Sequence, residues 1–206
     1  MPVADHPPVL TPLAFAVPVP LLWRVLALFL DCSLAGFAAW VILVRLVLPQ
    51  THPNAAGVIN DQMNIFYTEY QRVQATGDKP KFELSDEAIG IFQDAGNTFF
   101  LTLLVYFSAS ELATAGSTLG KRVFGLRTAR WFTGEPPRPI ESLTRSLFKV
   151  ASLLFFWPFL LLVNTLPALA HASRRAGHDH LARTCVTRTP LPAPVADHRH
   201  PADDEE

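Results

Sequence analysis

One acidic residue, Asp31, interrupts the most apolar stretch of the chain. A carboxylate there costs roughly 2.5–3.5 kcal/mol to place in a membrane unless it is paired, protonated or in a wet cavity. Arg24 lies seven residues earlier, about 10 Å away along the same helix face. Because Arg24 can extend toward the lipid headgroups, we expect Asp31 to find a partner on another element, with Arg145 or Lys121 as candidates. Asp31 is then either a proton or cation site, or half of a buried ion pair that fixes helix register.

A second set of charged residues and glycines begins near the end of the next apolar stretch. Its members are Glu111, Gly120, Lys121, Arg122, Gly125, Arg145, His178 and Asp179. Together with Arg24 and Asp31, we expect these residues to form one binding or structural charged network.

The histidines around Asp179 raise the question of a metal site. His178 and His180 flank Asp179, and His171 lies nearby. We expect instead a hydrogen-bonded turn that ties this tail to the segment 120–122, and no metal.

The sequence contains no recognisable arrangement of catalytic residues. Cys32 lies in an apolar block and Cys185 in a basic tail, an arrangement that predicts neither a disulfide framework nor a zinc site. The chain also has no Gly-rich phosphate loop, no nucleophile beside a base and no paired catalytic acids. We therefore expect no catalytic residue, no cofactor and no enzymatic activity.

The elements that position the charged residues are apolar blocks. Half of the 206 residues are hydrophobic, and the net charge is −1. The hydrophobic residues gather in three blocks separated by charge and proline, a pattern typical of membrane segments. We predict an all-α membrane protein with transmembrane helices at about 22–48 and 88–112, and a third, Pro-broken hydrophobic segment at 147–170.

The two predicted transmembrane helices have clear boundaries. Between Arg24 and Arg45 lie twenty residues whose only charge is Asp31. They make about 30 Å of helix, which matches the hydrocarbon thickness of a bilayer. In the second block, Ser85 is followed by two acidic residues, which is typical of a helix N-cap and its first turn.

The distribution of charge predicts the topology. Residues 49–94 carry three basic and seven acidic side chains, whereas residues 112–149 carry seven basic and two acidic ones. The positive-inside rule therefore predicts a cytoplasmic N-terminus, an external loop at 49–87 and a cytoplasmic second loop. The tail after the third segment is also basic. A re-entrant hairpin bent at Pro158 would keep both flanks of that segment inside; the alternative is a third span with an external tail.

The external loop contains a periodic apolar pattern. Ile59, Met63, Phe66, Tyr70 and Val73 recur at helical spacing. This pattern predicts an amphipathic helix that lies on the outer leaflet or caps the bundle.

Short strands are predicted on the cytoplasmic side. Val123, Leu126 and Thr128 favour one strand and residues 181–188 a second, together a small cytoplasmic β-hairpin-like element. The Pro-rich termini, 1–19 and 189–206, are predicted to be disordered tails. They flank a membrane domain at 20–188.

Four segments form an ordered pattern along the chain. They are Arg24-Val-Leu-Ala-Leu-Phe-Leu-Asp31, Thr118-Leu-Gly-Lys-Arg-Val-Phe-Gly-Leu-Arg127, Arg145, and Arg174-Arg-Ala-Gly-His-Asp-His-Leu-Ala-Arg-Thr184. Their order and spacing resemble the RDD family of membrane proteins over roughly residues 20–188. Two positions depart from the family's pattern: Leu119 stands where the family often has Pro, and Arg183 where it usually has Gly.

The resemblance implies a multi-pass protein of the bacterial plasma (inner) membrane. It implies no settled biochemical activity, although ion transport has been proposed for some members. We expect a structural or accessory envelope component; the alternative is a small ion or solute transporter that uses Asp31. We also expect the basic cytoplasmic loop to contact anionic lipid headgroups, and the chain to form a homo-oligomer or bind a membrane partner, but not nucleic acid.

Overall fold

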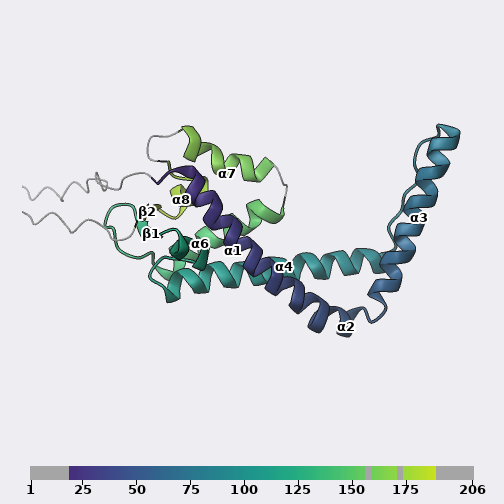
Figure 1. Cartoon of the computed structure of the whole chain (residues 1–206), viewed down its shortest axis with the longest axis horizontal. Coiled ribbons are helices and arrows are strands. Elements are labelled where there is room, and N and C mark those ends of the chain that lie inside the picture. The colour runs from purple at the N-terminus through teal and green to yellow at the C-terminus, as the bar shows by residue number, and fades with distance from the viewer. Residues whose placement is uncertain (1–18, 156–158, 171–173, 189–206) are drawn as a thin grey trace, which may run out of the picture.

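The computed structural model describes residues 19–155, 159–170 and 174–188. These residues are mostly helical, with one small antiparallel sheet. Two long helices cross each other; a helical arm lies beyond one end of the crossing, and the sheet lies at the other end (Figure 1). The predicted disordered tails lie outside the described residues except for Val19, which is buried against Ala27, Leu126 and Val186. At this position the prediction of a disordered tail is wrong, because Val19 completes an apolar contact between the first helix and the sheet.

Both predicted transmembrane segments are long helices. The first consists of α1 (Leu21–Ile42), a π-helical stretch (Leu43–Val47) and α2 (Leu48–Thr51). The second is α4 (Asp86–Ala113), and the Ser85 hydroxyl accepts a hydrogen bond from the amide of Ala88 at 3.2 Å, which confirms the predicted N-cap. Among the described residues, these two helices are long and apolar enough to cross a membrane.

A stripe of small residues brings α1 close to its neighbours. The buried residues of α1 are Ala27, Asp31, Ala35 and Ala39, spaced by four. Ala35 packs in one apolar cluster with Leu103, Phe107 and Val150. Small side chains let helix backbones approach closely in a membrane. Asp31 is therefore a carboxylate within a stripe of alanines that otherwise favours close helix packing.

The third hydrophobic segment forms two short helices. They are α6 (Pro139–Leu154) and α7 (Phe159–Ala170), which pack against each other. Helix α6 also packs on α4, and α7 packs on α8 (Gly177–Leu181). With 16 and 12 residues, each is shorter than the roughly 20 residues that a spanning helix needs. The predicted bend at Pro158 lies outside the described residues.

The predicted strands form an antiparallel pair. Strand β1 (Leu126–Arg130) pairs with β2 (Thr184–Arg188), with Leu126 opposite Arg188. The two strands are not a hairpin in connectivity, because α6, α7 and α8 lie between them in sequence. Val123, predicted to begin the first strand, ends the short helix α5 (Leu119–Val123). Likewise the predicted second strand begins three residues later than expected, because residues up to 181 belong to α8.

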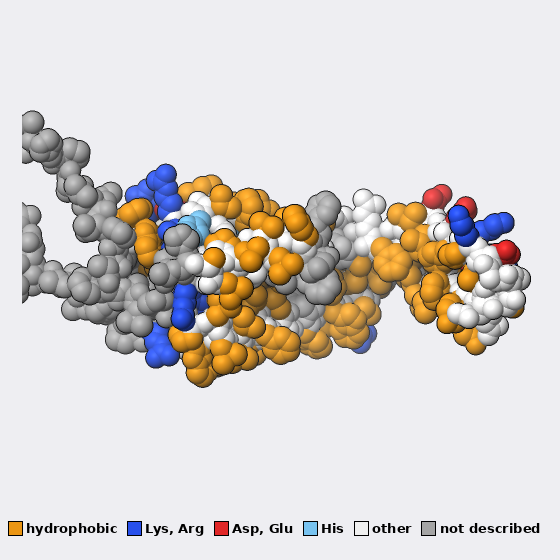
Figure 2. All heavy atoms as spheres, turned by 90° about the horizontal axis from the view of Figure 1, so that it is seen from above, with side chains coloured by type: hydrophobic (Ala, Val, Ile, Leu, Met, Phe, Trp, Pro, Cys, Tyr) orange, Lys and Arg blue, Asp and Glu red, His pale blue; other side chains and the backbone are white. Residues whose placement is uncertain are grey.

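The predicted amphipathic helix is α3 (Ala55–Thr76), which ends at Gly77 in a left-handed conformation. Residues 77–85 return along it: the side chain of Gln62 donates to the carbonyl of Glu83 at 3.0 Å and accepts from the amide of Ser85 at 3.1 Å. We call α3 and residues 77–85 the arm. The arm extends away from α1 (Figure 1), and charged side chains gather toward one end of it, whereas apolar side chains cover the side nearer the bundle (Figure 2). Met63, Phe66 and Tyr70 of its predicted apolar stripe are exposed, with Met63 at 61%. The other two, Ile59 and Val73, are half-buried.

Candidate functional site

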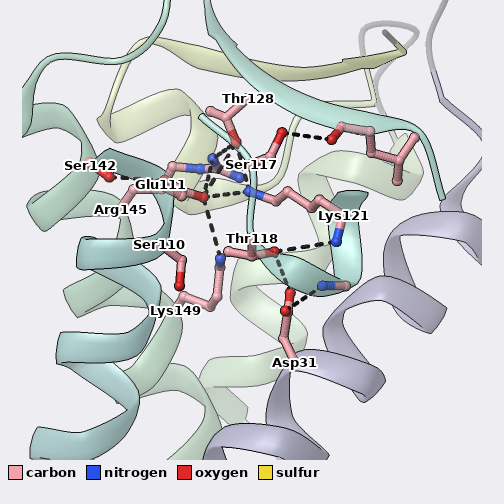
Figure 3. Close-up of polar contacts among 12 residues, drawn as sticks. Asp31, Ser110, Glu111, Ser117, Thr118, Lys121, Thr128, Ser142, Arg145 and Lys149 are labelled. Carbon is pink, nitrogen blue, oxygen red and sulfur yellow. Dashed lines mark hydrogen bonds and ion pairs between the residues drawn. The ribbon is translucent and has the colours of Figure 1, made fainter. Parts of the chain in front are cut away.

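Three carboxylates and four basic side chains meet at the end of the molecule that carries the sheet. They are Asp31, Glu111, Asp179, Arg24, Lys121, Arg145 and Lys149, which we call the charge cluster. All but Arg24 are buried. Most of them, with the hydroxyl side chains around them, are drawn in Figure 3. The cluster draws on α1, α4, α5, α6 and α8, so it joins elements that are far apart in sequence.

Asp31 is held by hydroxyl groups and a backbone amide. It accepts hydrogen bonds from the Tyr106 hydroxyl at 2.6 Å, the Thr118 hydroxyl at 2.5 Å and the amide of Gly120 at 2.7 Å. The expectation that Arg145 or Lys121 would pair with Asp31 is wrong, because both bind Glu111 instead. Asp31 thus fastens the start of α5 to α1 through neutral donors.

The approach of α5 to α1 explains why residue 120 is a glycine. Thr118 caps α5, accepting from the amide of Lys121 at 3.4 Å. A Cβ atom at Gly120 would collide with the carbonyl of Ala27 and lie 2.9 Å from the Asp31 carboxyl carbon. Only a residue without a side chain fits where the two backbones meet.

Glu111 is shared by three cations. Its Oε1 pairs with Lys121 Nζ, with Arg145 Nη1 at 3.0 Å and with Lys149 Nζ at 3.9 Å. Its Oε2 accepts from the Ser142 hydroxyl at 3.1 Å. Removing one partner from such a buried group is costly, because the remaining charges stay desolvated.

Arg145 bridges the carboxylates of Glu111 and Asp179. Its Nη1 bonds Glu111, and its Nε donates to Asp179 Oδ1 at 2.8 Å. Asp179 also accepts from the amide of Ala176 at 3.2 Å, so it closes the first turn of α8. The predicted turn at Asp179 therefore ties the tail to α6, rather than to the segment 120–122.

Arg24 turns into the protein, against the expectation that it extends toward the headgroups. Its guanidinium donates to the carbonyls of Arg174 at 2.5 Å and Val186 at 3.2 Å, and lies 3.9 Å from Asp179. These contacts bind the start of α1 to the segment before α8 and to β2.

Burial and neighbouring charge shift the pKa values in this region. Burial, followed by the nearby Arg145 guanidinium, lowers the pKa of Lys121 to about 7. Burial also lowers the pKa of His178 to about 3, so the ring is neutral at pH 7. For Asp179 burial acts to raise the pKa, but Arg145 and its other neighbours outweigh it and hold the pKa well below its ordinary value.

Four of the predicted residues are not part of the charge cluster: Gly120, Arg122, Gly125 and His178. Arg122 and Gly125 are exposed; Gly125 has φ +63° and makes the turn from α5 into β1. His178 lies beside the cluster, with Nδ1 2.9 Å from the Asn164 side-chain oxygen and Nε2 3.5 Å from Asp179.

The sequence did not point to Lys149 of the charge cluster or to two hydroxyl side chains that contact it, those of Ser142 and Tyr106. Lys149 and Ser142 lie four after and three before Arg145 on one face of α6, so helical spacing could have identified both. Tyr106 gives no such signal, because 75 residues separate it from Asp31.

The residue types also limit which groups could bind here. Within the part of the chain that the structure describes, no three His, Cys, Asp or Glu side chains are grouped to hold a metal ion; His171 lies outside that part. Both cysteines are free. Burial raises the pKa of Cys185 to about 11, so it is a thiol at pH 7.

Comparison with known proteins identifies a family whose match includes the residues of the charge cluster. Residues 18–183 match the RDD family. Neither the curated proteins nor the solved structures include a match. The matched region contains both long helices and the whole charge cluster, and it ends at Arg183, the position where the family usually has Gly. With a family match over most of its length, the chain belongs to the RDD family, a membrane-associated family.

Proposed function

We propose that this RDD-family protein is a structural or accessory component of the bacterial inner membrane, without enzymatic activity. Its charge cluster stabilises the packing of α5, the sheet and α8 against the ends of α1 and α4. The observation that carries this proposal is the state of Asp31, whose two oxygens accept three hydrogen bonds from α4, from α5 and from the residue that caps α5.

The contacts of Asp31 favour this role over transport. A carboxylate that carries protons or cations must exchange its partners during each cycle. The donors to Asp31 instead come from helices packed against α1, and the hydroxyl of Thr118 is committed to capping α5 as well. The geometry therefore supports a fixed role for Asp31 in helix register.

We further propose a topology with a cytoplasmic N-terminus and a re-entrant α6–α7 hairpin. The pairing of β1 with β2 brings Arg130, shortly before α6, next to Thr184, shortly after α7. Both flanks of the third hydrophobic segment are thus joined in one sheet, which favours a hairpin over a third span. The exposed Arg122 and Arg138 would then face the anionic headgroups of the inner leaflet.

External protease can test this topology. A tag at the C-terminus should resist protease in intact spheroplasts and be cleaved after lysis. A tag cleaved in intact spheroplasts would support the three-span alternative and contradict the hairpin.

The role of Asp31 can be tested with Asp31→Asn. The side-chain NH2 group of asparagine would replace an oxygen that accepts hydrogen bonds and would face a hydrogen-bond donor. We therefore expect a loss of roughly 1.5–3 kcal/mol in the free energy of unfolding. Reconstituted vesicles should show no proton or cation flux with either protein. Asp61→Asn, at an exposed position on α3, is the matched control and should leave stability unchanged. Flux that the wild type supports and a folded Asp31→Asn protein lacks would overturn the proposal.

A further inference from the structure

The charge cluster borders a cavity between α1, α6, α7 and α8. Its volume is about 120 Å³, several times the roughly 10–15 Å³ that one water needs. One wall is apolar and includes Leu21, Val25 and Leu28 of α1 and Ala168 of α7. Charged residues also line the cavity; they are Arg24, Asp31, Lys121, Arg145, Lys149 and Asp179. The cavity is thus mostly apolar, with a few charged side chains of the cluster in its lining.

The charges around this cavity do not balance. The cluster holds four cations, Arg24, Lys121, Arg145 and Lys149, against the three carboxylates. His178 adds no compensating negative charge, because a histidine ring is neutral or positive. With every basic group protonated the excess is one positive charge, and it shrinks as Lys121, whose pKa is about 7, loses its proton. Such unpaired charge is expensive in a buried region.

Lys149 is the most loosely held of the three cations on Glu111. Its Nζ lies 3.9 Å from Glu111 Oε1, whereas Arg145 lies at 3.0 Å and Lys121 closer still. The ammonium rests 4.2 Å above the centre of the Phe107 ring, and the residue is only 6% exposed. A buried ammonium that lines a cavity and has only a distant shared counter-ion is well placed to receive an anion.

We propose that this cavity binds the anionic headgroup of a membrane phospholipid, with Lys149 as the main contact for the phosphate. The acyl chains would run along the apolar wall of α1. Val25 lines the cavity and is also 53% exposed, so the cavity reaches the outer surface of a membrane-spanning helix. A lipid could enter there from the side, and its charge would neutralise the excess of the cluster. This inference goes beyond the structural role proposed for the charge cluster and does not depend on it.

The test is thermal unfolding of the purified full-length protein in a neutral detergent. Phosphatidylglycerol should raise the midpoint temperature by about 5 °C in a saturable way. Phosphatidylcholine and inorganic phosphate should each raise it by less than about 1 °C. No rise with phosphatidylglycerol, or an equal rise with phosphatidylcholine, would overturn the proposal. An equal rise with inorganic phosphate would indicate a site for a small soluble anion and would overturn the lipid assignment.

Variants locate the site. Lys149→Gln should weaken the phosphatidylglycerol response about tenfold in midpoint concentration, and Lys149→Arg should restore it. Arg188→Gln removes an exposed charge at the end of β2, outside the cavity, and should keep the full response. A response that falls equally in Lys149→Gln and Arg188→Gln would assign the lipid to the general basic surface and overturn the proposal.

A second pair of variants covers the case in which Lys149→Gln does not fold. Val25→Trp fills the apolar wall from a half-exposed position and leaves the charge cluster intact. It should abolish the response to phosphatidylglycerol. Val123→Trp, at an apolar position that is also exposed but lies outside the cavity, should retain it. An unchanged response in Val25→Trp would contradict binding at this cavity.

Discussion

The two ends of the molecule contain ion pairs of nearly the same geometry in different surroundings. In the charge cluster, Glu111 and Arg145 lie 3.0 Å apart, and both side chains are buried. On the arm, Glu69 and Arg72 lie 2.8 Å apart and remain partly exposed. Their neighbour Asp78, 3.0 Å from Arg72, is largely exposed.

The two pairs differ in the sequence separation of the residues that they connect and in how strongly solvent screens them. Arg145 joins residues 34 positions away in both directions along the chain, on α4 and α8. Arg72 joins a residue three positions away and the turn that follows its own helix. Solvent screens the pair on the arm, so its loss costs little. In the cluster the loss of one partner leaves buried charges uncompensated. Burial, rather than distance, therefore decides which ion pairs hold this fold.

The largest effect is expected from Glu111→Gln. Three cations would face a neutral amide in a buried site, and we expect a loss of roughly 3–5 kcal/mol in the free energy of unfolding. Denaturant titration of the purified protein measures it. Glu135→Gln is the matched control, because Glu135 pairs with Arg130 at 2.9 Å but is 64% exposed. Similar losses in the two variants would show that burial does not set the value of these pairs.

Acidification should affect the cluster end through His178. The folded-state pKa of His178 is lowered to about 3 by burial, so between pH 6.5 and pH 3 the unfolded chain binds the extra proton. Stability should therefore fall as the pH drops below 6.5, by about 2 kcal/mol at pH 5 from this group alone. Asp179 raises this pKa, and Arg145, Lys149 and Lys121 lower it. Unfolding midpoints at pH 7 and pH 5 measure the change.

Two variants assign that pH dependence to one ring. His178→Asn should remove most of the loss between pH 7 and pH 5. His52→Asn, near the arm, should keep it, because His52 contacts Asp94 and lies outside the cluster. If the loss on acidification survives in His178→Asn, the effect belongs to other groups.

Local sequence signals predicted the local structure well. The long helices and the Ser85 cap depend on runs of apolar residues and on contacts three residues apart. The sequence also marks Asp31 and Glu111 as unusual, because an acidic residue at the end or inside an apolar segment stands out. These features require no knowledge of how distant segments pack.

The partners of the acidic residues could not be predicted in the same way. The Tyr106 and Thr118 hydroxyls lie 75 and 87 residues from Asp31. A hydroxyl next to a carboxylate leaves no charge pattern in the sequence, so the basic residues were the natural candidates. The inward turn of Arg24 was missed for a similar reason, because its acceptors are backbone carbonyls that every residue has.

A departure from the family's pattern supplies a smaller test at the cluster end. Arg183 has φ +52°, a left-handed conformation that costs a non-glycine residue roughly 1 kcal/mol. The Gly that the family usually has there adopts it freely. Arg183→Gly should therefore stabilise the protein slightly, by at most about 0.5 kcal/mol after the extra entropy of the unfolded chain is subtracted. Arg188→Gly, at an exposed position in β2, is the control and should destabilise. A loss of stability in Arg183→Gly would mean that its side chain contributes more than the strain costs.

The smallest effect is expected on the arm, from Glu69→Gln. Hydrogen bonds from Arg72 and from the amide of Lys81 lower the pKa of Glu69 to about 2, yet solvent reaches the pair. We expect no measurable change in the global unfolding midpoint. Hydrogen exchange should instead become faster locally at Lys81, whose amide donates to Glu69 at 2.6 Å, and remain unchanged in α4 and α6. Gln62→Ala removes the two hydrogen bonds that hold the base of the arm and should speed exchange at Ser85 in the same way. A fall in the global midpoint after Glu69→Gln would show that the arm and the charge cluster unfold as one unit, so the contrast between the two ends would no longer hold.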